Sequence, residues 1–294
     1  MQIQVIYRRY NCYNQPITIK TLKLMYTHPF FRRFFSFLLF YLSSYSICIA
    51  ASTEAIISTK YLLIEHANYN IYGDRLNKEQ GRIPGLQLAV SSTSKRLEGI
   101  ASVDIYSGNV PYDGKATNGD FSSTTSIKLN RFSYRLNEKR PNSYSQFYGV
   151  VTFSDWHRNI QPQGDIAGLN RQYQWWSLEG GLRMGLFSSQ RTVIRADIGL
   201  TRSIFSKVQI DLRDHNLGKP VLLLKDNFGA SGKLVLRHML NKTHGLTLFL
   251  NASYWEFGKS DKRSIQNNIE TVPVQEPMSQ TTIVEFGATY FYKF

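Results

Sequence analysis

The first of three segments whose residues could do chemistry is IDLRDHNLG at 210–218, which contains Asp211, Asp214 and His215. An adjacent carboxylate and imidazole can form a base that activates water for hydrolysis. In an extended chain, however, neighbouring side chains point to opposite sides, so Asp214 and His215 would diverge. The alternative interpretation is an exposed turn, where Asp and Asn hydrogen-bond to the local backbone.

A second polar segment, SGNVPYDGKATNGDFSS at 107–123, could hold a cation. Asp113-Gly114 and Asn118-Gly119-Asp120 offer oxygen ligands of the kind that Ca²⁺ prefers. The spacing is not that of an EF-hand, and the same glycines are typical of turns. We therefore expect no metal and no cofactor, and the simpler prediction is a turn.

Tryptophan flanks a third polar segment. Trp156, Trp175 and Trp176 surround a loop that carries Arg158 and Arg171. Tryptophan at both ends of a loop is typical of an interfacial belt at a membrane surface, which is the favoured interpretation. The alternative is a surface for carbohydrate or for lipopolysaccharide, whose phosphates the two arginines would bind.

The first 50 residues have the pattern of an export leader. They contain no Asp or Glu, and their basic residues precede an apolar run and then small residues, as in a cleavable signal peptide. The apolar run before Ser43 is too short for a membrane-spanning helix, which needs about 20 residues. We expect translation to start at Met25 and cleavage near Ala50, leaving one barrel domain at 51–294; an uncleaved anchor is the alternative.

Composition limits the function of the remaining chain. The protein has 35 basic and 21 acidic residues, but the leader accounts for part of the excess. No nucleic-acid-binding motif accompanies the charge, so we expect no nucleic-acid partner. Cys12 and Cys48 both lie in the leader, which excludes disulfides and thiolate metal sites from the mature chain.

The rest of the chain alternates between apolar and polar residues, which predicts β-strands and no long helix. Connectors alternate between long and short, as in an up-and-down transmembrane barrel with short periplasmic turns and longer outer loops. The fold class we predict is all-β, an antiparallel transmembrane β-barrel of about ten strands, with eight or twelve as alternatives. The predicted strands are 59–72, 84–94, 97–106, 122–136, 144–156, 172–187, 191–206, 222–240, 245–257 and 281–294.

Charged residues alternate with the apolar faces of these strands, so we expect them to face the lumen. A ten-stranded barrel is narrow, and buried charges of both signs need partners, which predicts a plugged polar lumen with Tyr173, Trp175 and Trp255 filling the gaps. A narrow pore for small solutes is the alternative. The expected lumen charges are Glu98, Asp104, Lys128, Glu179, Arg183, Arg195, Asp197, Lys233, Arg237 and Glu285, and the uncharged Asn130 and Asn251 are expected to face the lumen with them.

The last strand carries the most specific pattern. Val284, Phe286, Ala288, Tyr290, Tyr292 and Phe294 share one face. This strand resembles the C-terminal strand of Gram-negative outer-membrane barrels, in which a terminal Phe and alternating aromatic residues form the signal for the assembly machinery. The resemblance implies that Tyr290, Tyr292 and Phe294 are the assembly signal, and that the protein is located in the cell outer membrane.

Three further motifs extend this resemblance. They are VPYDG at 110–114, W-x-R-x-I at 156–160, and GL…Y-x-W…LE-x-G through 168–181. Together they are similar to a group of proteobacterial outer-membrane β-barrel proteins to which no activity is assigned. The similarity implies the fold and the location and assigns no catalytic residue.

The alternative function is that of an enzyme similar to the omptins, which are ten-stranded outer-membrane proteases. They separate their Asp and His by one residue and place a carboxylate pair opposite, whereas Asp214 and His215 are adjacent here. Asp214, His215 and Asp113 are the weak catalytic candidates. We predict a monomeric surface protein in contact with outer-membrane lipid and lipopolysaccharide, with a structural, adhesive or ligand-binding role, and leave an omptin-like hydrolase open.

Overall fold

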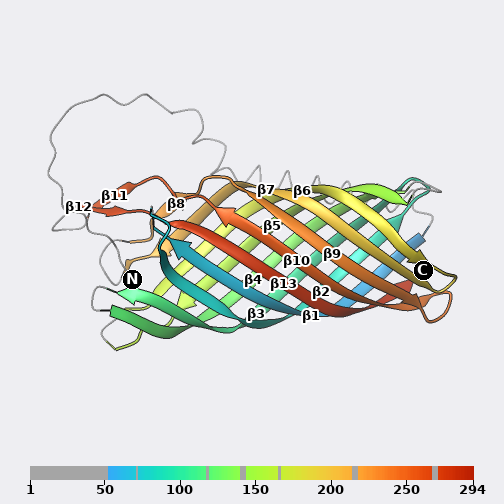
Figure 1. The fold of residues 1–294 in the computed structure, drawn as a ribbon, viewed down its shortest axis with the longest axis horizontal. Helices are drawn as coiled ribbons and strands as arrows, with labels where there is room; N and C mark the ends of the chain where they lie inside the picture. Colours follow the sequence, from blue (N-terminus) through green and yellow to red (C-terminus); the bar gives the residue numbers. More distant parts are fainter. Residues whose placement is uncertain are drawn as a thin grey trace, which may run out of the picture.

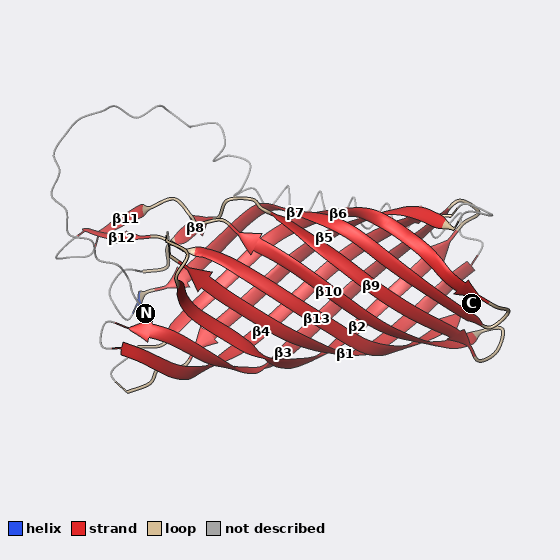
Figure 2. Cartoon of the chain, viewed as in Figure 1, coloured by secondary structure: helices blue, strands red, loops and turns tan. Residues whose placement is uncertain are grey.

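The structure is a computed structural model that describes residues 52–70, 72–116, 119–139, 144–164, 167–213, 218–266 and 271–294. The predicted leader, with Met25 and Ala50, lies outside these ranges. The described chain folds into one closed, tilted barrel without helices (Figures 1 and 2). The barrel strands are β1 (Ser52–Tyr69), β2 (Arg75–Thr93), β3 (Leu97–Ala116), β4 (Gly119–Glu138), β5 (Ser145–Ile160), β6 (Leu169–Ser188), β7 (Thr192–Asp211), β9 (Phe228–Met239), β10 (His244–Phe257) and β13 (Met278–Lys293).

Each barrel strand pairs antiparallel with the next one along the barrel, and β1 closes the ring against β13. The register of this seam runs from Glu54 opposite Lys293 to Tyr69 opposite Met278. Three short strands are added at one end, namely β8 (Val221–Leu223) beside β7 and the hairpin of β11 (Arg263–Gln266) and β12 (Thr271–Val274). The prediction of a ten-stranded antiparallel barrel is confirmed.

The two ends of the barrel differ. The short connectors and the C-terminus lie at one end, which we call the turn end; the long connectors, with β8, β11 and β12, lie at the other, which we call the loop end (Figure 1). Several predicted loops are strands instead. The segment 107–121, predicted as a loop, continues β3 and β4 up to the pair Ala116–Gly119. Val110 and Tyr112 are buried there while the residues on either side of them are exposed, so the strand pattern persists with its apolar side toward the lumen.

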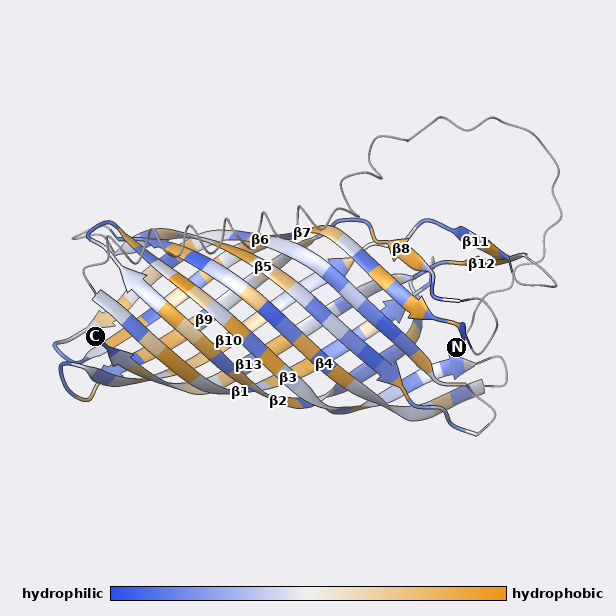
Figure 3. Cartoon of the chain, turned by 180° about the vertical axis from the view of Figure 1, so that it is seen from behind, coloured by the Kyte–Doolittle hydropathy of each residue, from blue (hydrophilic) through white to orange (hydrophobic). Residues whose placement is uncertain are grey.

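Outward side chains are apolar over the turn-end half of the barrel. Leu88 and Ile105 are more than half exposed, as are other large residues on this face, and the outward positions of β13 carry Phe286, Tyr290 and Tyr292. We call this the apolar belt. Near the loop end the strands become mostly polar (Figure 3). A barrel that spans a bilayer needs such a belt.

Inward side chains change character in the opposite direction. In the turn-end half the lumen is charged, whereas in the loop-end half a cluster of buried apolar residues fills it. On β7 a bulge sets this change. Phe205, whose φ is 56°, interrupts the register with β6. An extra residue reverses the alternation, so Ile198 and Leu200 point outward while Val208 and Ile210 point inward and are buried.

Candidate functional site

The catalytic candidates do not assemble at the barrel mouth. Asp214 and His215 lie outside the described residues. Asp113 projects outward from β3 and is exposed, and the hydroxyl of Ser122 donates a 2.7 Å hydrogen bond to it. Among the described residues no group of three or more His, Cys, Asp and Glu is arranged to hold a metal ion.

Asp211 lies at the loop end of β7, outside the apolar belt. Its carboxylate pairs with Arg213 at 2.9 Å and with Lys219 at 3.1 Å. Hydrogen bonds from Arg213, followed by one from Lys219, lower the pKa of Asp211 well below its usual range. The group therefore stays ionised at neutral pH and cannot donate a proton in catalysis.

One carboxylate–imidazole couple escaped the sequence analysis. On β5 the Nε2 atom of His157 lies 3.2 Å from Oδ2 of Asp155, and the amides of Gln172 and Gln174 on β6 donate to the same carboxylate. The signal was the D-x-H spacing in DWH. Both side chains point outward above the apolar belt, so the couple does not face the mouth.

The lumen charges form three layers, and we name them by position. The turn-end network joins β3, β4, β6 and β7. Arg183 bridges Asp197 at 3.0 Å and Glu98 at 3.2 Å, and Arg135 pairs with the other oxygen of Asp197. Asn137 donates to Glu98 at 2.8 Å. The expected lumen residues Glu98, Arg183 and Asp197 are thus brought together.

The middle network centres on Glu285 of β13. Lys60 contacts Asp104 at 2.6 Å and Glu285 at 3.1 Å, while Arg131 and Tyr106 bind the other oxygen of Glu285. The ring of Tyr106 lies over Gly85, where a Cβ atom would come within 2.3 Å of it. Glycine therefore lets this tyrosine reach across the lumen. Sequence analysis found Asp104 and Glu285 but not Lys60 and Arg131.

The other expected lumen residues are placed as follows. Glu179 accepts hydrogen bonds from Tyr148 and Ser231, and Arg237 pairs with Glu54 at 2.7 Å. Arg195 shares the lumen-facing side of β7 with Asp197, two residues away. Lys233 and Asn251 also face the lumen. Lys128 and Asn130 do not fit the expectation.

Lys128 is on the outside of the barrel and exposed. The prediction that it faces the lumen is wrong, and the same holds for Asn130. The neighbours Ile127 and Leu129 point inward and are buried. Near the loop end the apolar side of the strand is the lumen side, so the rule that apolar residues face lipid gives the opposite orientation there.

The loop-end network was not predicted. Glu79 and Arg158 form a two-fold contact, with Arg158 nitrogens 2.7 and 3.0 Å from the two carboxylate oxygens, and neither side chain is exposed. Arg158 also donates to Tyr173. The hydroxyl of Tyr173 donates a 2.6 Å hydrogen bond to Glu276, which pairs with Arg171 at 2.9 Å.

These contacts correct two expectations about the third polar segment. Trp156 and Trp175 point inward and are 1% and 7% exposed, so they belong to the core and not to an interfacial belt. Arg158 and Arg171 are buried in the lumen with carboxylate partners and do not face lipopolysaccharide. Of the three tryptophans only Trp176 faces outward, against Phe153.

The long connectors close the mouth above this network. Leu222 and Leu224 from the β8 segment, and Val272 and Val274 from β12, join the buried cluster. The connector between β10 and β13 is fastened at its base, because Ser260 N–H bonds to the carbonyl of Glu276 and Glu276 N–H to the Ser260 hydroxyl. The described residues therefore present a capped barrel.

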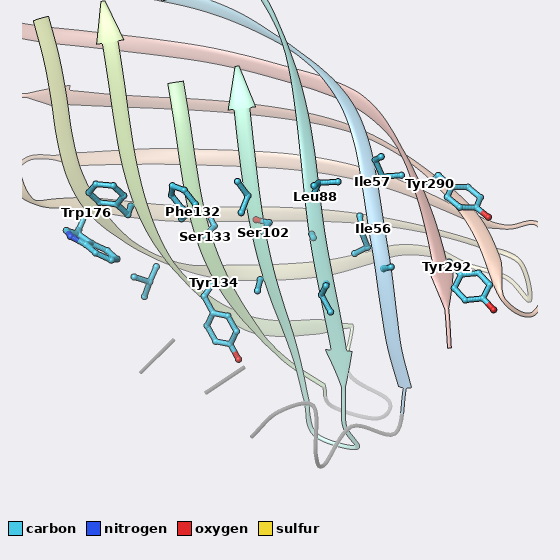
Figure 4. A pocket seen from close by; sticks show the side chains of 17 residues that line it. Ile56, Ile57, Leu88, Ser102, Phe132, Ser133, Tyr134, Trp176, Tyr290 and Tyr292 are labelled. Carbon is cyan, nitrogen blue, oxygen red and sulfur yellow. The ribbon is translucent and has the colours of Figure 1, made fainter. Parts of the chain in front are cut away.

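A shallow hollow of about 730 Å³ lies on the outer surface of the barrel, across the seam and the neighbouring strands. Figure 4 shows Phe132, Tyr134 and Trp176 at one side and Tyr290 and Tyr292 at the other. Its lining is mostly apolar and belongs to the apolar belt, so it offers few groups for polar chemistry.

Comparison with known proteins supports the fold. No protein family and no curated protein matches the sequence. The outer membrane protease OmpT from Escherichia coli superposes with a TM-score of 0.60 at 9% identity, covering 83% of this chain and 97% of OmpT. The translocator domain of autotransporter NalP from Neisseria meningitidis gives 0.44 at 9% identity (84% and 91% covered), and OprG from Pseudomonas aeruginosa gives 0.37 at 14% (83% and 97%). At 9% identity the likeness to OmpT shows the fold alone, and that fold is the outer-membrane β-barrel.

Proposed function

We propose that this chain is a monomeric outer-membrane barrel that is sealed to solutes and acts at the cell surface. The loop end faces the exterior and the turn end the periplasm, where Tyr290, Tyr292 and Phe294 serve the assembly machinery. The supporting observation is the stack of three ion-pair networks beneath a capped mouth. Buried charges that are paired this closely are costly to separate, so they do not leave an aqueous path.

Electrical conductance tests the seal. In planar bilayers the refolded protein is expected to give no current steps above the lipid background, because all three networks would have to open together. A variant that removes the turn-end cations, Arg135→Ala with Arg183→Ala, retains two networks and is expected to stay closed as well. Wild-type steps at the nanosiemens level would contradict the proposal and support the alternative of a narrow pore.

The proposed surface partner is lipopolysaccharide. Arg82 on β2 and Lys128 on β4 point outward, are exposed and make no ion pair with another described residue. They follow the apolar belt on the loop-end side, where the phosphates of an outer-leaflet lipid would lie. The two residues lie on strands separated only by β3 and are offset by two residues in register, so their Cα atoms are about 12 Å apart on the outer wall. Such a pair suits an anionic headgroup.

This contact is tested by measuring how tightly a double variant that lacks both positive charges binds lipopolysaccharide. Arg82→Gln with Lys128→Gln is expected to bind lipopolysaccharide about thirtyfold more weakly than the wild type, since each of the two surface cations contributes about 1 kcal/mol toward anionic lipid. The matched control, Lys95→Gln with Arg96→Gln, makes the same charge change in an exposed turn at the turn end. Equal affinities for both double variants would refute the contact.

Hydrolysis at the mouth is the second candidate. The likeness of the fold to OmpT, which is named a protease, favours it. Against it, Asp113 points away from the mouth and the Asp155–His157 couple lies on the outer wall. Refolded protein that cleaves no member of a peptide library would remove this candidate. Cleavage abolished by Asp214→Ala with His215→Ala would establish it.

A further inference from the structure

Glu276 differs from the other buried acids of the lumen because it does not belong to the barrel wall. It lies on the connector between β10 and β13, and it reaches inward with 2% of its surface exposed. Its Oε1 atom accepts from Arg171 Nη1 at 2.9 Å and from the Tyr173 hydroxyl at 2.6 Å. Two donors on β6 therefore bind a carboxylate that is brought from outside the barrel.

These donors are only partly satisfied by Glu276. The Nε atom of Arg171 is buried and has no hydrogen-bond partner among the described residues. The indole nitrogen of Trp156 is in the same situation, and its ring lies 5.6 Å from that of Tyr173. An arginine can hold a carboxylate through two parallel N–H bonds. Buried donors without partners cost free energy, so the site favours an acceptor that is freer to adjust than Glu276.

The two arginines of the loop-end network, Arg158 and Arg171, differ in how their carboxylate partners are held. Arg158 is neutralised by Glu79, which is fixed on β2. Arg171 pairs with Glu276, so withdrawal of Glu276 would leave this guanidinium without a counter-charge among the described residues. A buried cation without a partner is strongly unfavourable, which drives the binding of another anion in its place.

The residues of the connector that precede Glu276 indicate the chemical character of an anion that could replace it. Val272 and Val274 precede Glu276 and pack into the apolar cluster at the mouth. The occupant thus combines an apolar body with one carboxylate. The middle and turn-end networks lie deeper in the lumen and make no contact with Glu276, so its departure would uncover a site without opening a path.

We infer that Arg171 and Tyr173 form a binding site for the carboxylate of a small ligand with an apolar body, and that Glu276 occupies this site when the ligand is absent. The inference deepens the proposed surface role and rests on it, since the ligand reaches the site from the loop end. The ligand class is a monocarboxylate such as a short fatty acid.

The test uses the full barrel in lipid vesicles with hexanoate as the probe and 1-hexanol as its neutral analogue, each corrected against protein-free vesicles. Binding is read by calorimetry and by tryptophan fluorescence. Glu276→Gln weakens the internal contact and is expected to bind hexanoate at least tenfold more tightly than the wild type, with no gain for 1-hexanol. The matched control, Glu256→Gln on β10, is expected to behave like the wild type.

A second substitution locates the site. Adding Arg171→Gln to Glu276→Gln is expected to abolish the gain, and adding Tyr173→Phe to weaken hexanoate binding several-fold in a barrel that keeps its charges. Unchanged hexanoate affinity in Glu276→Gln, or an equal gain for 1-hexanol, would overturn the inference. Conductance of the same samples separates the two proposals. If the protein passes no current but Glu276→Gln does not bind hexanoate more tightly, only the carboxylate site is rejected. If current steps appear, the sealed barrel is rejected.

Discussion

Replacing Glu285 with alanine is expected to lower the free energy of unfolding of the barrel by about 3–5 kcal/mol. Glu285 is the common partner of Lys60, Arg131 and Tyr106, and its side chain is 5% exposed. Its removal leaves two buried cations with Asp104 as the only carboxylate of the middle network. Urea unfolding of the refolded protein in vesicles, followed by tryptophan fluorescence, measures the change.

A substitution on the other face of the same strand provides the control. Thr282→Ala changes an exposed outward residue of β13 and is expected to alter the free energy of unfolding by less than about 0.5 kcal/mol. If Glu285→Ala cost no more than this control, the middle network would not stabilise the barrel, and the lumen charges would have to be solvated.

The second large effect is expected for Arg158. Arg158→Met alone should destabilise the barrel by about 3–5 kcal/mol, because it leaves the Glu79 carboxylate fully buried without its cation. Glu79→Leu combined with Arg158→Met removes both charges, and apolar replacement of a whole buried pair is often neutral. The double variant should therefore be more stable than Arg158→Met in the same unfolding experiment.

The four corners of this double-mutant cycle give the coupling energy directly. An exposed cation supplies the comparison: Lys115→Met removes a charge near the loop end and should change the free energy of unfolding little. Additive losses from the two single substitutions would show that Glu79 and Arg158 act independently, and that their short contacts contribute nothing specific.

The strands that cross the apolar belt were predictable because two rules agree there. On β13 the outward positions from Val284 to Tyr292 are apolar and Glu285 lies between two of them, so the alternation predicts both the strand and its inward face. The same holds on β6, where Leu178 and Leu182 alternate with Glu179 and Arg183. Strand number and lumen-facing charge followed from this pattern.

The loop-end half was not predictable by these rules, since its strands leave the lipid. There the outward face meets water and can be polar, while the inward face fills a closed lumen. Lys128 and Trp156 were therefore assigned to the wrong sides. No residue pattern marks the point along the strands at which the outward face passes from lipid to water. The bulge at Phe205 also reverses which positions of β7 face inward, and only the three-dimensional structure reveals this.

Glu276 could not be identified from its local sequence. It is one acidic residue in a long polar connector, and its partners Arg171 and Tyr173 lie about 100 residues earlier in the chain, at separations of 105 and 103. A faint signal existed, because Val272, Val274 and Glu276 alternate with Pro273 and Gln275 as in a short strand. Such a pattern indicates an inward-facing segment but not what it contacts.

The seam between β1 and β13 has a consequence for how this chain comes to be folded. The strands that must meet are the first and the last, so the pairing of Glu54 with Lys293 spans nearly the whole described chain. Closing such a long loop is slow, since ordering entropy is lost before the contacts form. Until the final strand arrives, β1 and β10 expose unpaired edges that invite pairing with other chains. The chain is therefore an open sheet until β13 has paired with both neighbours, and the time of greatest aggregation risk ends only with that strand.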